Sequence, residues 1–192
     1  MRYTLNISLF IQSVEEEGTD KFLCVMPDSH SSSFSLLQIK SSSGHIISRK
    51  MRLRRSSKLM HYDPLTLVIA PTQEGFAQGT LYMDDEATLA HQTKGAYVYR
   101  KFTFQDNVLT CASAVLTPAA VRAQYRPPNT VERVEIANQK SPPKRVVYRS
   151  TSASNTQPGV EIMTYFNAER GVLILKKPDG NVGDDWAITL EY

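Results

Sequence analysis

The sequence is poor in the residue types that build metal and cofactor sites. Its 192 residues include one tryptophan and two cysteines, Cys24 and Cys111. Two cysteines are too few for a disulfide framework or a cysteine-rich zinc site, and we expect Cys111 to be a small buried side chain. None of the four histidines has a second histidine at a metal-ligand spacing such as His-x-x-x-His: His30, His45, His61 and His91. The sequence therefore predicts neither a metal site nor a bound cofactor.

The chain also lacks a long hydrophobic run and a strong net charge. No apolar stretch approaches the ~20 residues that a membrane-spanning helix needs, so we expect no membrane span. The formal net charge is +3, which on its own does not indicate nucleic acid or another polyanion as a partner. The first residues form a poor secretory signal, because Thr4, Asn6 and Ser8 interrupt their apolar run.

Common catalytic motifs are missing as well. The sequence has no Gly-x-Ser-x-Gly elbow, no phosphate-binding glycine loop and no Cys–His signature. It does contain two acidic pairs, Asp84–Asp85 and Asp184–Asp185. Neighbours on a strand point to opposite faces, whereas a glycosidase needs two carboxyl groups that face each other across the scissile bond. We therefore expect a structural turn at Asp84–Asp85 and no catalytic residue in this chain.

What the sequence does have is a series of short runs rich in β-branched, aromatic and leucine residues. Its composition, 41% hydrophobic and 21% charged, is typical of a globular domain. The number and spacing of the runs predict an all-β fold, an antiparallel β-sandwich, with a turn at Pro178–Asn181. The expected strands are Leu65–Ala70, Gly79–Met83, Ala96–Phe104, Val108–Val115, Thr130–Ile136, Arg145–Arg149, Val160–Phe166, Val172–Leu175 and Trp186–Leu190.

Two segments near the start differ from this pattern. Residues 1–43 contain serine-rich, linker-like stretches, so we expect a poorly packed or disordered leader, with an extra strand pair as the alternative. From Arg49 to Lys58, six of the ten residues are basic. Met51 and Leu53 are two apart, as in an edge strand, and no aromatic residue is interleaved to stack on bases. A solvated basic strand or loop is therefore favoured over a nucleic-acid site.

The order of several motifs makes the chain resemble a known family. The motifs are RKMRLRRSS (Arg49–Ser57), DPLTLVIA (Asp63–Ala70), GTLYMDDE (Gly79–Glu86), YRKFTF (Tyr99–Phe104), VERVEI (Val131–Ile136) and the segment Leu173–Leu190. Together they resemble the C-terminal β region of the family 31 glycoside hydrolases, in the branch of the glucosidase II α subunits. The resemblance runs from about Gly44 to Tyr192. Glu86 departs from it, because the family has a glycine there, and a positive φ at that position would strain Glu86.

The resemblance implies a division of the chain. Residues 1–43 precede it, residues 44–63 correspond to a remnant of the proximal C-terminal β domain, and residues 64–192 correspond to the distal C-terminal β-sandwich. The family hydrolyses α-glucosidic bonds with two carboxylates housed in a (β/α) barrel. The nucleophile motif of that barrel, Trp-x-Asp-Met-Asn-Glu, is absent from this sequence. We therefore expect the chain to be inactive alone and to be a truncated or mis-started part of a larger enzyme.

The resemblance also implies partners and a compartment. A family 31 barrel in the same or another chain would complete the enzyme, and the full α subunit works with a separate glucosidase II β subunit. That enzyme trims glucose from N-linked glycans in the lumen of the endoplasmic reticulum. The alternative function is a stand-alone carbohydrate-binding β-sandwich, with Trp186, Tyr97 and Tyr99 as platforms for stacking on sugar rings. For Trp186, an anchor in the core or at a domain interface is favoured over stacking.

Overall fold

The computed structural model describes residues 43–114, 125–151 and 159–192, and within these ranges the chain is all-β. Residues Ser43–Tyr192 form one compact unit. The expectation for residues 1–43 falls, apart from Ser43, outside the described residues. The elements are β1 (His45–Arg49), η1 (Ser57–Met60), β2 (Leu65–Ala70), β3 (Ala77–Met83), α1 (Ala90–Thr93), β4 (Val98–Gln105), β5 (Val108–Ser113), β6 (Thr130–Ile136), β7 (Arg145–Ser150), β8 (Val160–Glu161), β9 (Met163–Asn167), β10 (Val172–Asn181) and β11 (Trp186–Glu191).

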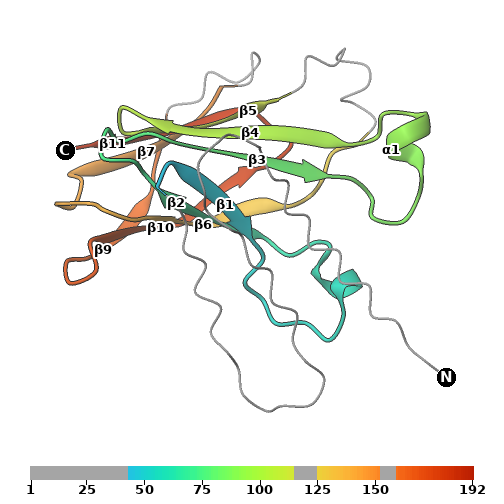
Figure 1. Cartoon of the computed structure of the whole chain (residues 1–192), viewed down its shortest axis with the longest axis horizontal. Helices are drawn as coiled ribbons and strands as arrows, with labels where there is room; N and C mark the ends of the chain where they lie inside the picture. Colours follow the sequence, from blue (N-terminus) through green and yellow to red (C-terminus); the bar gives the residue numbers. More distant parts are fainter. Residues whose placement is uncertain (1–42, 115–124, 152–158) are drawn as a thin grey trace. The chain divides into compact units, whose positions relative to one another are not determined.

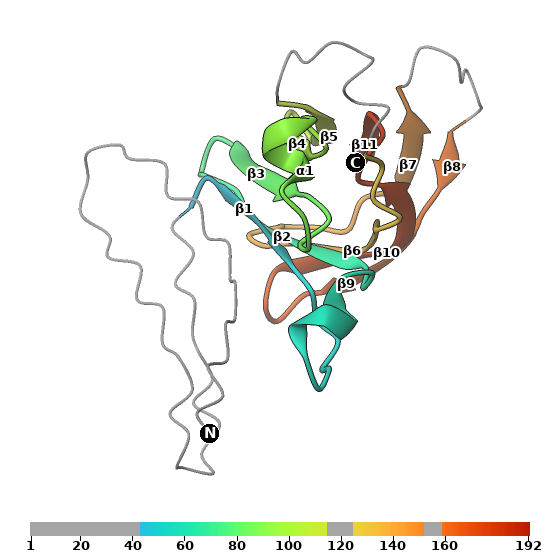
Figure 2. The same cartoon turned by 90° about the vertical axis from the view of Figure 1, so that its right-hand side faces the viewer.

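The strands form two layers (Figure 1 and Figure 2). Their hydrogen-bonded order is β8-β7-β11-β5-β4-β3-β1-β2-β6-β10-β9. β3 and β1 share a single bridged pair, Gln78 with His45, and the sheet folds over at this seam. The six strands from β8 to β3 form one layer, and the five strands from β1 to β9 form the other. The β-sandwich predicted from the sequence is confirmed, with parallel pairing added between β1 and β3 and between β2 and β6.

The hydrophobic core lies between the two layers. The six-stranded layer contributes Trp186, Phe102 and Phe104, each at most 2% exposed, and the five-stranded layer contributes the fully buried Leu67 and Leu173. Each such side chain stabilises the fold by roughly 1.5–3 kcal/mol through its removal from water. The period-2 alternation of the strands produces this arrangement, because every second residue points inward.

A close approach of backbone at the seam explains one glycine. A Cβ atom at Gly79 of β3 would lie 2.1 Å from the carbonyl oxygen of Ile46 in β1. No side chain fits in that space, so glycine at this position allows β1 to cross β3 where the two layers meet.

Three expectations from the sequence are corrected in detail. The run Val160–Phe166 is divided into β8 and β9 at Ile162, which is buried and whose N–H donates to the carbonyl of Val146. The turn expected at Pro178–Asn181 is instead an irregularity within β10, which continues to Asn181. The basic segment is not an edge strand, because β1 ends at Arg49 and lies between β2 and β3.

No helix in the described part of the chain is long and apolar enough to cross a membrane.

Candidate functional site

The acidic turn after β3 uses its carboxylates to close itself. Asp84 accepts the backbone N–H of Glu86 at 2.8 Å and the hydroxyl of Tyr82 at 3.2 Å. Asp85 accepts both the hydroxyl and the backbone N–H of Thr88, the latter at 3.0 Å. The bond from the Thr88 hydroxyl is the main reason that the pKa of Asp85 lies below its usual value. These interactions are those of a structural turn, as expected for Asp84–Asp85.

The second acidic pair lies at the rim of the sandwich core, where it meets two arginines. Arg100 of β4 is 3% exposed and donates to the carboxylate of Asp185 and, at 2.6 Å, to the backbone carbonyl of Asp184. The side chain of Asp184 pairs with Arg126 at 2.7 Å. Both carboxylates are therefore engaged by arginines, and the buried guanidinium obtains the counter-charge that its desolvation requires.

Trp186 is enclosed by the fold. Its side chain is 1% exposed, and its indole N–H donates to the carbonyl of Asn181 at 3.1 Å. Its ring lies 6.1 Å, centroid to centroid, from both Phe102 and Tyr148. A sugar ring has no access to either face of this indole.

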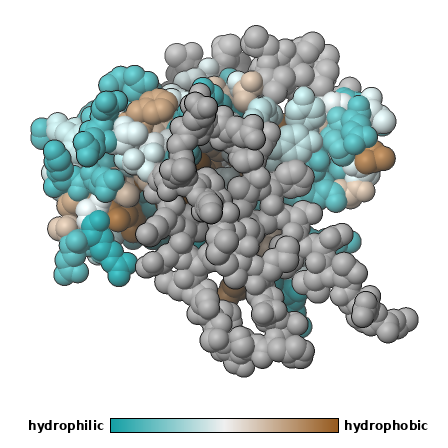
Figure 3. Space-filling model, viewed as in Figure 1, coloured by the Kyte–Doolittle hydropathy of each residue, from teal (hydrophilic) through white to brown (hydrophobic). Residues whose placement is uncertain are grey.

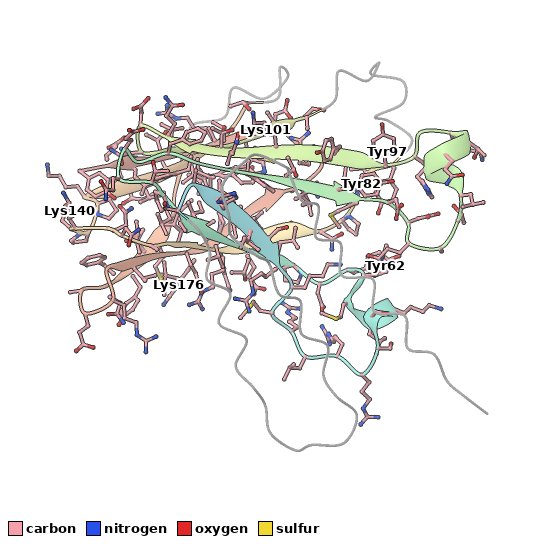
Figure 4. All side chains as sticks on the ribbon, viewed as in Figure 1. Tyr62, Tyr82, Tyr97, Lys101, Lys140 and Lys176 are labelled. Carbon is pink, nitrogen blue, oxygen red and sulfur yellow. The ribbon has the colours of Figure 1, made fainter. Side chains whose placement is uncertain are left out.

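Tyr97 and Tyr99 are half-buried near one end of the six-stranded layer. Tyr82 of β3 lies opposite Tyr99 and stacks on Tyr97, with 5.4 Å between the ring centroids. Figure 4 shows Tyr82 and Tyr97 next to each other at the end of the strands. Burial, together with the neighbouring Asp84, raises the pKa of Tyr82 to about 12. Reasoning from the sequence missed Tyr82, because only the register of β3 against β4 places it in this group.

Three of the six basic side chains in the segment Arg49–Lys58 pair with carboxylates of the same chain. Arg54 makes two hydrogen bonds to Asp63, at 2.7 and 3.0 Å, which lower the pKa of that carboxyl. Arg52 pairs with Glu132 at 3.1 Å. The backbone from Met51 to Ser56 is irregular, so the expected solvated basic segment is a loop. The ion pair between Arg52 and Glu132 connects that loop to the sheet, because Glu132 is part of β6.

Two remaining features also lack the geometry of a catalytic centre. Within the described ranges, no group of three or more His, Cys, Asp and Glu side chains is arranged to hold a metal ion. A shallow depression beside α1 is lined by Tyr125, Lys94, Ala90, Ala96 and a single carboxylate, Asp85. Glycoside hydrolysis needs two carboxyl groups across the bond that breaks, and this depression offers one.

Comparison with known proteins decides what the chain resembles. No family model matches it. Human neutral alpha-glucosidase AB is 36% identical over 147 residues, which cover 77% of this chain and 14% of the human protein. Glucosidase 2 subunit alpha of Saccharomyces cerevisiae is 52% identical over 66 residues, 34% of this chain. This chain resembles the C-terminal β region of the family 31 glycoside hydrolases of the glucosidase II type.

Solved structures agree with the family 31 resemblance. The crystal structure of a glucosidase II alpha subunit with Glc1Man2 bound is 27% identical, with a TM-score of 0.63, and the match covers 77% of this chain and 17% of that one. A dextranase of Flavobacterium johnsoniae shares the fold, with a TM-score of 0.52 at 16% identity. The resemblance inferred from the motifs is thus confirmed. The chain spans only 14% of the length of the human relative.

Glu86 stands where the resemblance to the family 31 glycoside hydrolases implies a glycine. Its φ is +55°, in the left-handed region that glycine adopts without steric cost. The strain foreseen for Glu86 is therefore present. Its carboxylate lies 3.3 Å from Nδ1 of His61 and 3.8 Å from Nζ of Lys50, so the side chain gains contacts that a glycine would not make.

Proposed function

We propose that this chain is the structural, non-catalytic C-terminal β-sandwich part of a glucosidase-II-like α-glucosidase. The observation that carries the proposal is the extent of the match, which covers 77% of this chain but 14% of human neutral alpha-glucosidase AB. The acidic pairs are consistent with it, because Asp84 and Asp85 close a turn and Asp185 pairs with Arg100. A glycosidase needs a positioned acid and a positioned nucleophile or base, and these carboxylates are used otherwise.

The proposal includes a division of the chain. Residues 44–63 derive from the proximal C-terminal β domain, residues 64–192 are the distal β-sandwich, and residues 1–43 are a leader before both. β1 pairs with β2 over its whole length, from His45 opposite Ala70 to Arg49 opposite Thr66. The proximal segment would thus lend one strand to the distal sheet and couple the two domains mechanically.

The complete enzyme would combine this part with a family 31 barrel and a glucosidase II β subunit. It would trim glucose from N-linked glycans in the lumen of the endoplasmic reticulum. This assignment is supported by similarity to the catalytic subunit of an ER glucosidase II heterodimeric complex, solved with the binding domain of its regulatory subunit. In this arrangement the chain meets the glycan only through the whole enzyme.

The test is hydrolysis of a chromogenic α-glucoside. The purified 192-residue chain should show no activity, whereas human neutral alpha-glucosidase AB should stay active when its 147 matched residues are replaced by those of this chain. An inactive replacement would overturn the assignment to a glucosidase. Activity of the chain alone, lost when Asp84, Asp85, Asp184 and Asp185 are changed to asparagine, would overturn its non-catalytic character.

A second function, binding of carbohydrate by the sandwich itself, is favoured by one observation. Tyr82, Tyr97 and Tyr99 form a group of three aromatic rings at the end of β3 and β4. Aromatic rings next to hydrogen-bonding groups suit sugar rings, and Asp84 lies beside Tyr82. Calorimetric titration with α-glucosides and N-glycan fragments should then give binding that Tyr97→Ala abolishes. No heat at millimolar sugar would remove this function.

A further inference from the structure

The two outer faces of the sandwich differ in chemistry. Across the six-stranded layer, the register places Gln78 of β3, Thr103 of β4, Thr110 of β5 and Ala187 of β11 in one outward row. Lys101 lies in the next outward row. Polar outward side chains of this kind are typical of a sheet that faces water. We call this surface the polar face.

The outer face of the five-stranded layer carries a row of mainly apolar residues. One row across it contains Ile47 of β1, Val68 of β2, Glu135 of β6, Ile174 of β10 and Tyr165 of β9. Ile47, Val68 and Ile174 are half-buried, and Tyr165 is 52% exposed. The single charge in the row, Glu135, is paired with an arginine of the same strand at 2.6 Å. A row of this composition is unusual for a solvated sheet and typical of a surface that meets another protein.

A row of cations borders the apolar one. Arg49, Arg133 and Lys176 follow each other across β1, β6 and β10, with Thr66 of β2 between the first two. Arg133 is paired within the chain, and the ammonium of Lys176 lies 5.7 Å from the ring centroid of Tyr165. Within the described ranges, neither Arg49 nor Lys176 has a carboxylate partner. We call the two rows together the docking face, and its complement is an apolar surface that carries carboxylates.

Residues 50–62, which include η1, extend beyond the docking face as a protrusion. Figure 1 and Figure 2 show this segment projecting from the five-stranded layer on the side away from the six-stranded layer. It exposes four large side chains to solvent: Leu53 at 99%, Tyr62 at 69%, Leu59 at 59% and Met51 at 54%.

The protrusion is held firmly at its base. Arg54 binds Asp63 through two hydrogen bonds, and the side-chain amide of Asn129 donates to the carbonyls of His61 and Asp63 at 2.8 and 2.9 Å. The exposed apolar side chains are therefore presented by an ordered segment.

Figure 3, which views the molecule from the side, shows mostly hydrophilic residues with small, separate hydrophobic patches among the described atoms. Figure 4 shows Lys176 on the docking face and Lys101 on the polar face, pointing in opposite directions.

We propose that the docking face and the protrusion form the surface through which this chain packs against the rest of a family 31 enzyme. The surface that it meets is apolar at its centre and carries carboxylates opposite Arg49 and Lys176. This inference rests on the proposed function and names the side of the sandwich that serves it. The comparison with human neutral alpha-glucosidase AB is the reason for choosing this partner. The match accounts for 14% of the human protein, so most of such an enzyme lies outside the matched part and is available to pack against it.

The test uses the active replacement described above, human neutral alpha-glucosidase AB carrying this chain in place of its matched residues. Val68→Glu and Ile174→Glu place a charge at the centre of the docking face, while Thr110→Glu makes a matched change on the polar face. Each docking-face change should lower the activity recovered in soluble enzyme by about tenfold, because an unpaired charge is costly in an apolar contact. Thr110→Glu should leave activity within about twofold of the parent, because the polar face tolerates a further polar side chain.

Charge reversal tests the chemistry of the partner. The double change Arg49→Glu and Lys176→Glu should lower recovered activity about tenfold through like-charge repulsion, whereas Lys101→Glu on the polar face should not. The same substitutions in the 192-residue chain, followed by thermal denaturation, identify any effect on folding itself. Equal activity of docking-face and polar-face variants would overturn the inference and leave the proposed function standing. An inactive parent replacement would overturn the proposed function, and the inference with it.

A second copy of this chain is the competing occupant. If Ile174→Glu converts a dimer of the 192-residue chain to monomer while leaving the activity of the replacement unchanged, the docking face is a self-association surface and the inference is overturned.

Discussion

Arg100 is a charged residue on an otherwise apolar strand face, with Phe102 and Phe104 at the next two inward positions of β4. Its nearest counter-charge, Asp185, is distant in the sequence but adjacent in the fold, and the carboxylate is 40% exposed. Water can solvate the half-exposed Asp185 carboxylate if Arg100 is lost, but it cannot reach the buried Arg100 guanidinium if Asp185 is lost. Arg100 depends on Asp185 more than Asp185 depends on Arg100.

This asymmetry gives the first prediction. Asp185→Asn should lower the free energy of unfolding by about 2 kcal/mol, because a buried guanidinium loses its counter-charge. Arg100→Met should cost less, because an apolar side chain suits the site and the half-exposed carboxylate stays hydrated. Urea unfolding of the two variants checks the order. Equal or reversed costs would contradict the assignment of Arg100 as the dependent partner.

The second prediction concerns backbone strain at Glu86, whose φ is +55°. Glu86→Gly should be more stable than Glu86→Ala by about 1 kcal/mol, because both changes lose the contacts with Lys50 and His61 but only alanine keeps the left-handed penalty. Glu135 in β6 is the matched control. There alanine should be the more stable of the two, since the backbone is an ordinary strand. If the alanine variant is more stable than the glycine variant at both positions, the strain at Glu86 is negligible.

At the scale of elements, the seam between β1 and β3 joins the two layers. A single bridged pair and the absence of a side chain at Gly79 allow the strands to approach there. The protrusion is the second distinctive element, because an ion pair between Arg54 and Asp63 closes it onto the start of β2. Both features depend on contacts between residues that belong to different elements.

The third prediction tests the seam. Gly79→Ala should destabilise the fold by about 3 kcal/mol, because its Cβ would overlap backbone that cannot move without separating β1 from β3. Thr80→Ala, on the adjacent outward position, should change stability by less than about 0.5 kcal/mol. Chemical denaturation measures both. A Gly79→Ala protein as stable as the parent would mean that β1 is not held at the seam.

The fourth prediction concerns acid. Arg54 lowers the pKa of Asp63 in the folded state below the ordinary value of 3.8. Stability from this pair is therefore complete above pH 3.8 and is lost as the pH falls through the lower, folded-state pKa. Asp63→Asn should flatten this part of the stability curve, measured by urea unfolding at a series of acidic pH values. An unaltered slope in Asp63→Asn would argue against the pair.

At the scale of the whole molecule, one outer face of the sandwich suits water and the other suits a protein surface. The contrast arises because outward residues of β3, β4 and β5 include threonine, glutamine and lysine together with Tyr82 and Tyr99, whose hydroxyls are polar, while those of β1, β2 and β10 include isoleucine and valine. A chain with an uncovered apolar face lowers its free energy by associating.

The fifth prediction follows from that face. The purified 192-residue chain should self-associate in sedimentation velocity experiments, more strongly in sulfate, which strengthens apolar contacts. Ile174→Glu should shift the distribution toward monomer, and Thr110→Glu should not. A clean monomer at every concentration would contradict an uncovered docking face.

The positions of many strands can be predicted from the sequence alone, because strand formation depends on residues that are close together in the chain. The β-branched and leucine-rich composition of the runs marked Leu65–Ala70 and Thr130–Ile136 with the bounds of β2 and β6. The motifs identified the family, and the missing glycine at Glu86 pointed to a backbone position that proved to have positive φ. Each of these conclusions depends on residues that are close together in the chain.

Tertiary structure alone decided the rest. The parallel pairing of β2 with β6, the engagement of Asp185 by Arg100 across 85 positions and the stacking of Tyr82 on Tyr97 all depend on which distant strands become neighbours. The apolar row on one outer face has the same origin. Sequence determines which side of its own strand a residue occupies, whereas the layer, the neighbour and the exposure of that side follow from packing the strands together.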